Sequence, residues 1–382
     1  MAPSMSHSKI HTTIDSIGNQ RWEQLCGTKD CFLNYDYLAA LESSGCVGNN
    51  TNWHPHHLVL SEQNEPVAAM PMYLKNDSYG EFVFDWGWAQ AAQSAGIPYY
   101  PKLVSSIPYT PVTGPRMTSG DPHLCRQLLE GVVATAETTE ASSWHLLFPN
   151  KETVDSLMSI AGNFRLLTRN DCHFVWFNRD YASFDDFLAG MNSRKRKSIR
   201  RERRKVAEQG VILNRYAGSA LSPQLMMLFY EFYQIPYQRR GRSPYLNLEF
   251  FQQLFERMQD RLMLVVATRE HQPVGAALFV CGDNSLSGRW WGGLPSIDCL
   301  HFEACYYQGI EYAIEKGFSR FDPGIQGEHK LLRGFEPEIT HSLHWIKDPR
   351  LSDAVEKWLA EERKHVGLYQ QQARQHLPYK QP

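Results

Sequence analysis

The stretch "HFEACYYQGIEYAIEKGFSRFDPGIQGEHKLLRGFEP" (residues 301–337) combines a helix pattern, a short strand and a charged turn. Its first part has helical composition and ends at Gly317, a residue suited to a C-terminal cap. The next residues read as a strand that ends at Asp322, because Pro323 and Gly324 interrupt strand pairing. This order is typical of α/β proteins, in which ligands bind in the loops beyond strand ends.

The turn after Asp322 concentrates ionisable side chains. Glu328, His329, Lys330 and Arg333 follow within a few residues. In an acyl transfer, a carboxylate or an imidazole can take the proton of an attacking amine, and a cation can stabilise the oxyanion that forms. We therefore predict a catalytic group of five residues, with Glu328 or His329 as the base: Asp322, Glu328, His329, Lys330 and Arg333. The alternative is an exposed turn whose charges are only solvated.

Neighbouring segments supply the residues that we predict to bind substrate. Glu303 and Tyr306 share one face of the predicted helix, and His301 lies at its start. The stretch "SLSGRWWGG" (285–293) adds an arginine and a tryptophan. No CxxC pair accompanies these residues, so no metal site is predicted. The predicted substrate-binding set is His301, Glu303, Tyr306, Arg289, Trp291 and Gln326.

The composition of the whole chain is that of a folded, soluble protein. The 382 residues are 42% hydrophobic and 21% charged, and the formal net charge is −2. This charge predicts no general attraction to nucleic acids or membranes, so any such partner must bind a local patch. No apolar run of about 18 residues is present, and the eight cysteines are scattered. We therefore expect no membrane span, reduced thiols and a cytoplasmic location. The sequence leaves the oligomeric state open.

Two stretches with the same pattern organise the predicted fold. "HHLVLSEQNEPVAAMPMYLK" (56–75) and "LMLVVATREHQPVGAALFV" (262–280) each read as a β-hairpin. Because similar elements follow each hairpin, we predict one α/β unit used twice. The predicted fold class is α/β (α+β), with a mixed, mostly antiparallel sheet flanked by helices in each half. Helical patterns occur at 31–45, 121–140, 223–241, 247–260, 301–317 and 352–371.

Between the halves lies the basic segment "SFDDFLAGMNSRKRKSIRRERRKVAEQG" (183–210), whose apolar residues predict one long helix. Residues 194–205 carry nine cations and one acid, Glu202. Like charges one turn apart repel by about 0.2–0.5 kcal/mol per pair, so the pattern favours an anionic ligand. The alternative is a solvated connector, or a helix paired with acids elsewhere. We predict that RNA phosphates or another polyanion contact Arg196, Lys197, Arg200, Arg201, Arg203 and Arg204.

Together, the two similar halves, the basic helix and the segment 301–337 resemble the FemAB-like branch of the GNAT acyltransferase superfamily. The resemblance extends over most of the chain and is most specific in 301–337. It implies tandem GNAT-like domains, which we place at 1–180 and 211–382, joined by a basic helix at 181–210. It also implies an active site in the second domain and a relation to Fem aminoacyltransferases. Those enzymes move an amino acid from charged tRNA to an amine of a peptidoglycan precursor.

Two departures from the family pattern bear on the donor. GNAT enzymes that use acetyl-CoA carry a Gln/Arg-x-x-Gly-x-Gly/Ala loop before a helix, and "GGLPSIDCLHFE" (292–303) lacks it. The long coiled-coil arm of Fem enzymes has no counterpart, since 223–260 reads as two ordinary helices.

The leading prediction is an acyl- or aminoacyltransferase that acts on a small-molecule or peptide amine, linked to cell-wall peptide synthesis. No cofactor is assigned, and aminoacyl-tRNA and acyl-CoA are the candidate donors. One alternative is a non-catalytic module that binds RNA, another polyanion or a ligand on the same scaffold. The other is an acyl-CoA-dependent N-acetyltransferase.

Overall fold

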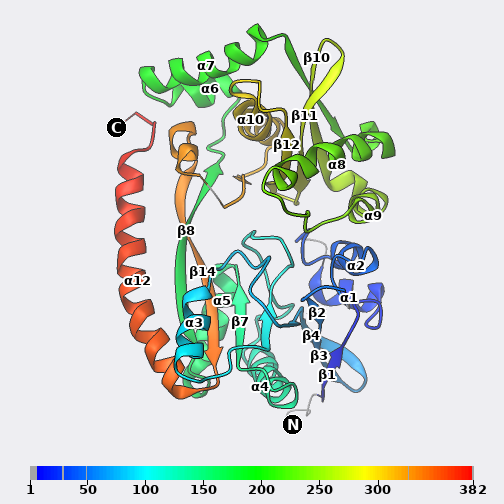
Figure 1. Ribbon diagram of the computed structural model, residues 1–382, viewed down its shortest axis with the longest axis vertical. Helices are drawn as coiled ribbons and strands as arrows, with labels where there is room; N and C mark the ends of the chain where they lie inside the picture. Colours follow the sequence, from blue (N-terminus) through cyan, green and yellow to red (C-terminus); the bar gives the residue numbers. More distant parts are fainter. Residues whose placement is uncertain (1–6, 28–29, 49, 326, 381–382) are drawn as a thin grey trace. The chain divides into compact units, whose positions relative to one another are not determined.

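A computed structural model describes residues 7–27, 30–48, 50–325 and 327–380 of the protein (Figure 1). The chain divides into two compact units. Unit 1 comprises Met1–Asp171 and Ile339–Leu368, and unit 2 comprises Cys172–Glu338 and Tyr369–Pro382. The sequence-based domains were continuous stretches of the chain. In the structure, the C-terminal segment Ile339–Leu368 belongs to the N-terminal unit.

Unit 1 contains strands from two sheets. The smaller sheet is antiparallel, with the order β1-β3-β4. The larger set has the order β2-β5-β6-β7-β14, in which β6 and β7 are parallel and the other neighbouring strands are antiparallel. The strands are β1 (His7–His11), β2 (His54–Pro55), β3 (His57–Glu62), β4 (Glu65–Met70), β5 (Tyr73–Lys75), β6 (Lys102–Ser105), β7 (Ser143–Leu147) and β14 (Glu336–Ile346), most of which lies in unit 1.

The helices of unit 1 bury apolar stripes against these strands. On α4, Leu128 and Val132 join a core with Leu58 and Leu60 of β3. A second core forms where Trp88 of α3 packs with apolar residues of α12. The helices are α1 (Asn19–Cys26), α2 (Tyr35–Ser43), α3 (Trp86–Ser94), α4 (Pro122–Thr138), α5 (Lys151–Ile160) and the first part of α12 (Pro349–Gln375).

Unit 2 is built on a sheet with the strand order β8-β13-β12-β11-β10-β9. Its pairs are antiparallel except β12 and β13, which run parallel. The strands are β8 (Leu167–Phe177), whose first residues lie in unit 1, β9 (Val211–Ala217), β10 (Leu262–Arg269), β11 (Gln272–Cys281), β12 (Ser285–Gly293) and β13 (Arg320–Asp322).

Helices cover both faces of this sheet because its side chains alternate between two cores. Trp290 of β12 packs edge-on against Phe251 of α9, with ring centroids 5.3 Å apart. Phe279 and Phe321 instead join a core with Ile310 of α11. The helices are α6 (Phe184–Ala189), α7 (Ser193–Glu208), α8 (Pro223–Gln238), α9 (Leu248–Met258), α10 (Leu300–Phe302) and α11 (Gln308–Lys316).

The structure confirms the predicted fold class and both hairpins, which are β3-β4 and β10-β11. The prediction of one long helix over 183–210 was wrong. The chain breaks after α6, and α7 starts anew where the Asn192 side chain accepts a hydrogen bond from the Lys195 N–H group. A bridge between Met191 and Tyr379 holds this break, a long-range contact that the local pattern does not reveal.

The helix predicted at 301–317 runs from α10 to α11 through a π-helical turn at Glu303–Tyr307. Such turns are often found at functional sites. Among the helices in the described ranges, none combines the length and apolar character needed to cross a bilayer.

Candidate active site

The candidate site in unit 2 lies where two parallel strands part. β12 and β13 pair only from Ser285 opposite Arg320 to Ser287 opposite Asp322. Beyond this point β12 continues to Gly293 paired only with β11, while β13 gives way to the turn that holds the predicted catalytic residues. The carboxyl ends of parallel strands are a common ligand position in α/β folds.

Lys330 is the buried charge of this turn. Lys330 is 1% exposed, and its Nζ donates a hydrogen bond to the carbonyl oxygen of Gly324. Burial lowers the pKa of the amine to about 8, although the carboxylate of Asp322 acts in the opposite direction. The amine is therefore mainly protonated at neutral pH, yet close to titration.

His329 lies beside a group of aromatic rings. Its Nε2 is 2.9 Å from the Tyr306 hydroxyl, and its ring centroid is 5.5 Å from Phe302 and 6.2 Å from His301. Burial, followed by the nearby Arg333 charge, lowers the pKa of His329. For His301, burial lowers the pKa to about 4. Both imidazoles are therefore neutral at physiological pH, the form in which an imidazole can accept a proton.

Arg333 is held from two sides. Its guanidinium donates to Glu202 of α7 at 2.8 and 3.2 Å and lies 3.5 Å from the centroid of the Phe302 ring. Nη1 also donates to the carbonyl oxygen of His329 at 2.7 Å. Tyr307 completes the cluster by donating to Glu202. The arginine therefore fixes the backbone of the turn and is itself neutralised by Glu202.

Arg203, next to Glu202 on α7, also points inward. It forms two hydrogen bonds with Glu303, each of 3.0 Å, and a third of 2.6 Å with Glu311. Glu303 is 4% exposed, and it also accepts a hydrogen bond from Gln308. We predicted Arg203 for a polyanion and Glu303 for substrate, but the structure pairs the two with each other.

The structure places the other predicted catalytic residues less uniformly. Glu328 is exposed and accepts a hydrogen bond from the Tyr369 hydroxyl at 2.8 Å. Asp322 is buried, and its Oδ1 accepts from the Gly324 N–H group at 2.8 Å, which shapes the start of the turn. Of Asp322, Glu328 and His329, the residue that lies beside the Tyr306 and Phe302 rings is His329.

The predicted residues on β12 also lie toward this region. The Trp291 ring centroid is 5.7 Å from that of His301. Arg289 lies in the irregular stretch where Leu278 opposes Trp290 and Phe279 opposes Gly288. Gln326 lies outside the described residues.

The outer face of α7 is strongly cationic. Arg194, Lys197 and Arg201 are exposed, and no carboxylate within the described residues lies within 4.0 Å of their charged groups. Arg200 and Arg204 are exposed too, but they pair with Asp185 and Glu208. The first turn of α7 contains no acid, so its cations add to the positive end of the helix dipole.

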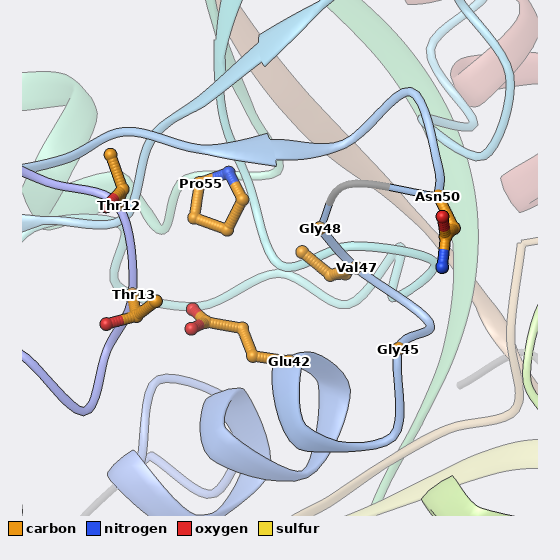
Figure 2. A pocket seen from close by; sticks show the side chains of 8 residues that line it. All are labelled: Thr12, Thr13, Glu42, Gly45, Val47, Gly48, Asn50 and Pro55. Carbon is orange, nitrogen blue, oxygen red and sulfur yellow. The ribbon is translucent and has the colours of Figure 1, made fainter.

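Unit 1 has a separate pocket of about 350 Å³. Figure 2 shows Glu42 directed into it, among Thr12, Thr13 and Pro55. Both carboxylate oxygens of Glu42 already have partners at 2.8 Å, the Ile14 N–H group and His57 Nε2. This acid is therefore engaged in holding the fold, and the site in unit 2 is the stronger candidate.

Sequence reasoning missed Glu202 and Phe302, which position Arg333 and the turn. One signal for Glu202 was present. It lies three residues after Ile199 and four before Val206, and both of these are 1% exposed. Residues at this spacing share a helix face, so the lone acid of the basic run had to point toward the core.

The comparisons with known proteins agree with this fold. The family model for FemAB-like proteins, described as peptidoglycan biosynthesis/recognition, matches residues 13–381. The chain therefore belongs to the FemAB-like family. A comparison with curated protein sequences gave no significant match.

Solved structures resemble the chain in fold at low sequence identity. FemX has a TM-score of 0.53 at 10% identity, with 92% of this chain and 100% of FemX covered. L-PGS from Bacillus licheniformis has a TM-score of 0.55 at 10% identity, covering 92% and 99%. The C-terminal domain of a putative lysylphosphatidylglycerol synthetase from Agrobacterium fabrum has a TM-score of 0.54 at 7% identity, covering 88% and 93%. The chain thus shares the fold of these proteins.

Proposed function

We propose that the protein transfers an aminoacyl group from tRNA to an amine acceptor in cell-wall synthesis. The observation that carries the proposal is the turn after β13, where a buried ammonium ion, Lys330, follows a neutral imidazole, His329. These are the two kinds of group that acyl transfer to an amine requires. Membership of a family described by peptidoglycan biosynthesis or recognition supports the cell-wall context.

The proposed reaction is a direct attack on the ester carbonyl. The acceptor nitrogen forms the new C–N bond and gives its proton to His329. The carbonyl oxygen becomes an oxyanion, which the ammonium group of Lys330 stabilises. The intermediate then breaks its C–O bond, and the departing ribose hydroxyl takes the proton back from His329. No covalent enzyme intermediate is formed.

Arg333 has a positioning role in this scheme. Glu202 neutralises the charge of Arg333, and Nη1 of Arg333 donates a hydrogen bond of 2.7 Å to the carbonyl oxygen of His329. Loss of Arg333 should therefore misplace the imidazole. We expect a fall in kcat with little change in KM, because the arginine does not bind substrate in this scheme.

The donor assignment rests on the outer face of α7. Its unpaired cations and the positive end of the helix attract phosphate groups. The segment 292–303 lacks the glycine pattern with which GNAT enzymes hold the pyrophosphate of acetyl-CoA. These features favour a polyanionic donor over an acyl thioester.

The test combines binding and transfer with bulk charged tRNA. Binding should weaken steeply with salt and fall in Arg201→Glu, but remain in Lys316→Glu, which reverses an exposed cation on α11. Lys330→Met should bind tRNA normally and transfer nothing. Displacement of tRNA by acetyl-CoA would contradict the donor assignment. If His329→Ala and Lys330→Met both keep full function, the protein is a binding module instead of an enzyme.

A further inference from the structure

The segment from the end of β5 to the first residue of α3 in unit 1 has an inverted burial pattern. Glu81 and Asp85 are each 2% exposed, whereas Tyr79, Phe84 and Trp86 are 54%, 58% and 42% exposed. Proteins normally bury aromatic rings and expose carboxylates. Both departures cost stability, so a pattern that combines them in one short segment points to a use for the exposed rings.

Two buried lysines anchor the acids of this segment. Lys75 on β5 and Lys102 on β6 lie directly opposite each other in the sheet. Nζ of Lys102 donates to Glu81 at 2.9 Å and to Asp85 at 2.5 Å. Nζ of Lys75 donates to the carbonyl oxygen of Tyr79 at 3.0 Å. These contacts fix the backbone of the segment, so that its exposed aromatic rings are held on a rigid support.

Gly80 brings the backbone close to the core between the exposed rings. Its φ is +78°, and a Cβ atom there would come within 2.6 Å of the Tyr109 ring and 3.2 Å of Nε1 of Trp53. Only glycine fits this approach without displacing its neighbours. The exposed rings of Tyr79 and Trp86 meet edge to face with centroids 4.9 Å apart.

The exposed rings continue onto α12. Arg169 lies between the rings of Trp88 and Trp358, 5.2 and 5.0 Å from their centroids. Its Nη1 donates to the carbonyl oxygen of Phe84 at 2.7 Å, which links the two segments. Trp358 is 46% exposed. We call Tyr79, Phe84, Trp86 and Trp358 the aromatic patch.

The two arginines near the aromatic patch, Arg165 and Arg169, are already paired. Arg169 forms an ion pair with Glu362 at 2.9 Å, and Arg165 pairs with Asp353 and Glu356 on α12. Exposed Lys357 lies next to Trp358 in the chain. With it, three cations stand against the three carboxylates of these pairs, so the local charge is balanced and favours an occupant without net charge.

The exposed area is small for a protein interface. With about 200 Å² per aromatic side chain, roughly 400 Å² of the aromatic patch is exposed. A stable dimer needs about 800 Å² on each partner. Tyr and Trp, with an apolar body and a polar end, are enriched where membrane lipid meets water.

We propose that the aromatic patch docks the protein onto the interfacial region of an uncharged or zwitterionic lipid bilayer. The rings enter the headgroup region, while the Lys75 and Lys102 network keeps the segment from collapsing onto the core. This proposal does not depend on the transfer reaction.

The test is co-sedimentation of the full chain with phosphatidylcholine vesicles. The triple variant Tyr79→Ser, Phe84→Ser, Trp86→Ser should lower the partition coefficient by at least about tenfold. The matched control is Ile212→Ser with Met227→Ser, which removes exposed apolar side chains, 65% and 49% exposed, from unit 2. The control should bind like the unchanged protein, and high salt should not release it.

Four results would overturn the proposal. The first three are no vesicle binding by the unchanged protein, equal binding by the triple variant, and binding that needs anionic lipid and disappears in Arg201→Glu. The fourth is self-association that the triple variant abolishes, which would indicate a protein partner. Circular dichroism checks the fold of each variant, and Phe84→Ser alone serves if the triple variant is unstable.

Discussion

Replacing Lys330 by methionine tests the electrostatic state of the candidate site. Burial lowers the pKa of this amine from its ordinary value of 10.5 to about 8. One pKa unit corresponds to 1.36 kcal/mol, so keeping the ammonium ion buried at neutral pH costs roughly 3 kcal/mol. Methionine has a similar length and no charge. We expect Lys330→Met to stabilise the fold by about 1–3 kcal/mol, the lower value allowing for the lost hydrogen bond to Gly324.

The same reasoning fixes the pH dependence. The unfolded amine keeps its proton up to about pH 10.5, whereas the folded amine loses it near pH 8. Between these values the unfolded state binds more protons, so the contribution of Lys330 to stability rises with pH. The advantage of the methionine variant should therefore be full below about pH 8 and disappear toward pH 10.5.

Urea unfolding of both proteins at about pH 7 and about pH 9.5 provides the measurement. Lys102→Met is the matched control, because this buried lysine has a raised pKa and two carboxylate partners. Its loss should destabilise the fold by about 3–5 kcal/mol. If Lys330→Met also destabilises by 2 kcal/mol or more, Lys330 is a satisfied structural ion and the proposed oxyanion role loses its basis.

Three further outcomes are expected. A double-mutant cycle with Glu202→Ala and Arg333→Ala should give a coupling energy of about 2–3 kcal/mol, and a value near zero would show that the pair is no clamp. Because the pKa of His329 is lowered, the acid limb of transfer should lie below pH 6.5, and a limb above this value would exclude this imidazole as the base. Burial raises the pKa of Glu81 from 4.5 to about 7, so the folded state binds more protons in this window and stability should fall as pH rises through it. Glu81→Gln should flatten that dependence in urea unfolding, and an unchanged slope would contradict the reasoning.

Local patterns were enough to predict much of the fold. The hairpins followed from alternating apolar residues around polar turns, and Gly317 ends its helix with φ of +69°, as expected for a cap. The break before α7 and the transfer of 339–368 to unit 1 depend on contacts between distant segments. No local spacing encodes such contacts.

The candidate site was predictable in composition and less so in roles. The cluster of charges after Asp322 was visible in the sequence, but burial decides what each group can do. Lys330 is buried and Glu328 is exposed, although they are two residues apart. The direction of each side chain depends on the 3₁₀ turn at Glu328–Arg333, which the charge pattern alone does not specify.

The division of labour on α7 follows from helical geometry. Ile199, Glu202, Arg203 and Val206 share the inner face, where two residues are apolar and two are ion-paired to the turn or to the π-helical segment. Arg201, next to Glu202 in the chain, points to solvent. One helix therefore supports the candidate site from its inner face and offers cations on its outer face. In the proposed reaction the exposed cations of α7 attract the donor, whereas the buried ammonium group of Lys330 stabilises the oxyanion. These two charges stay separate because Glu202 neutralises Arg333.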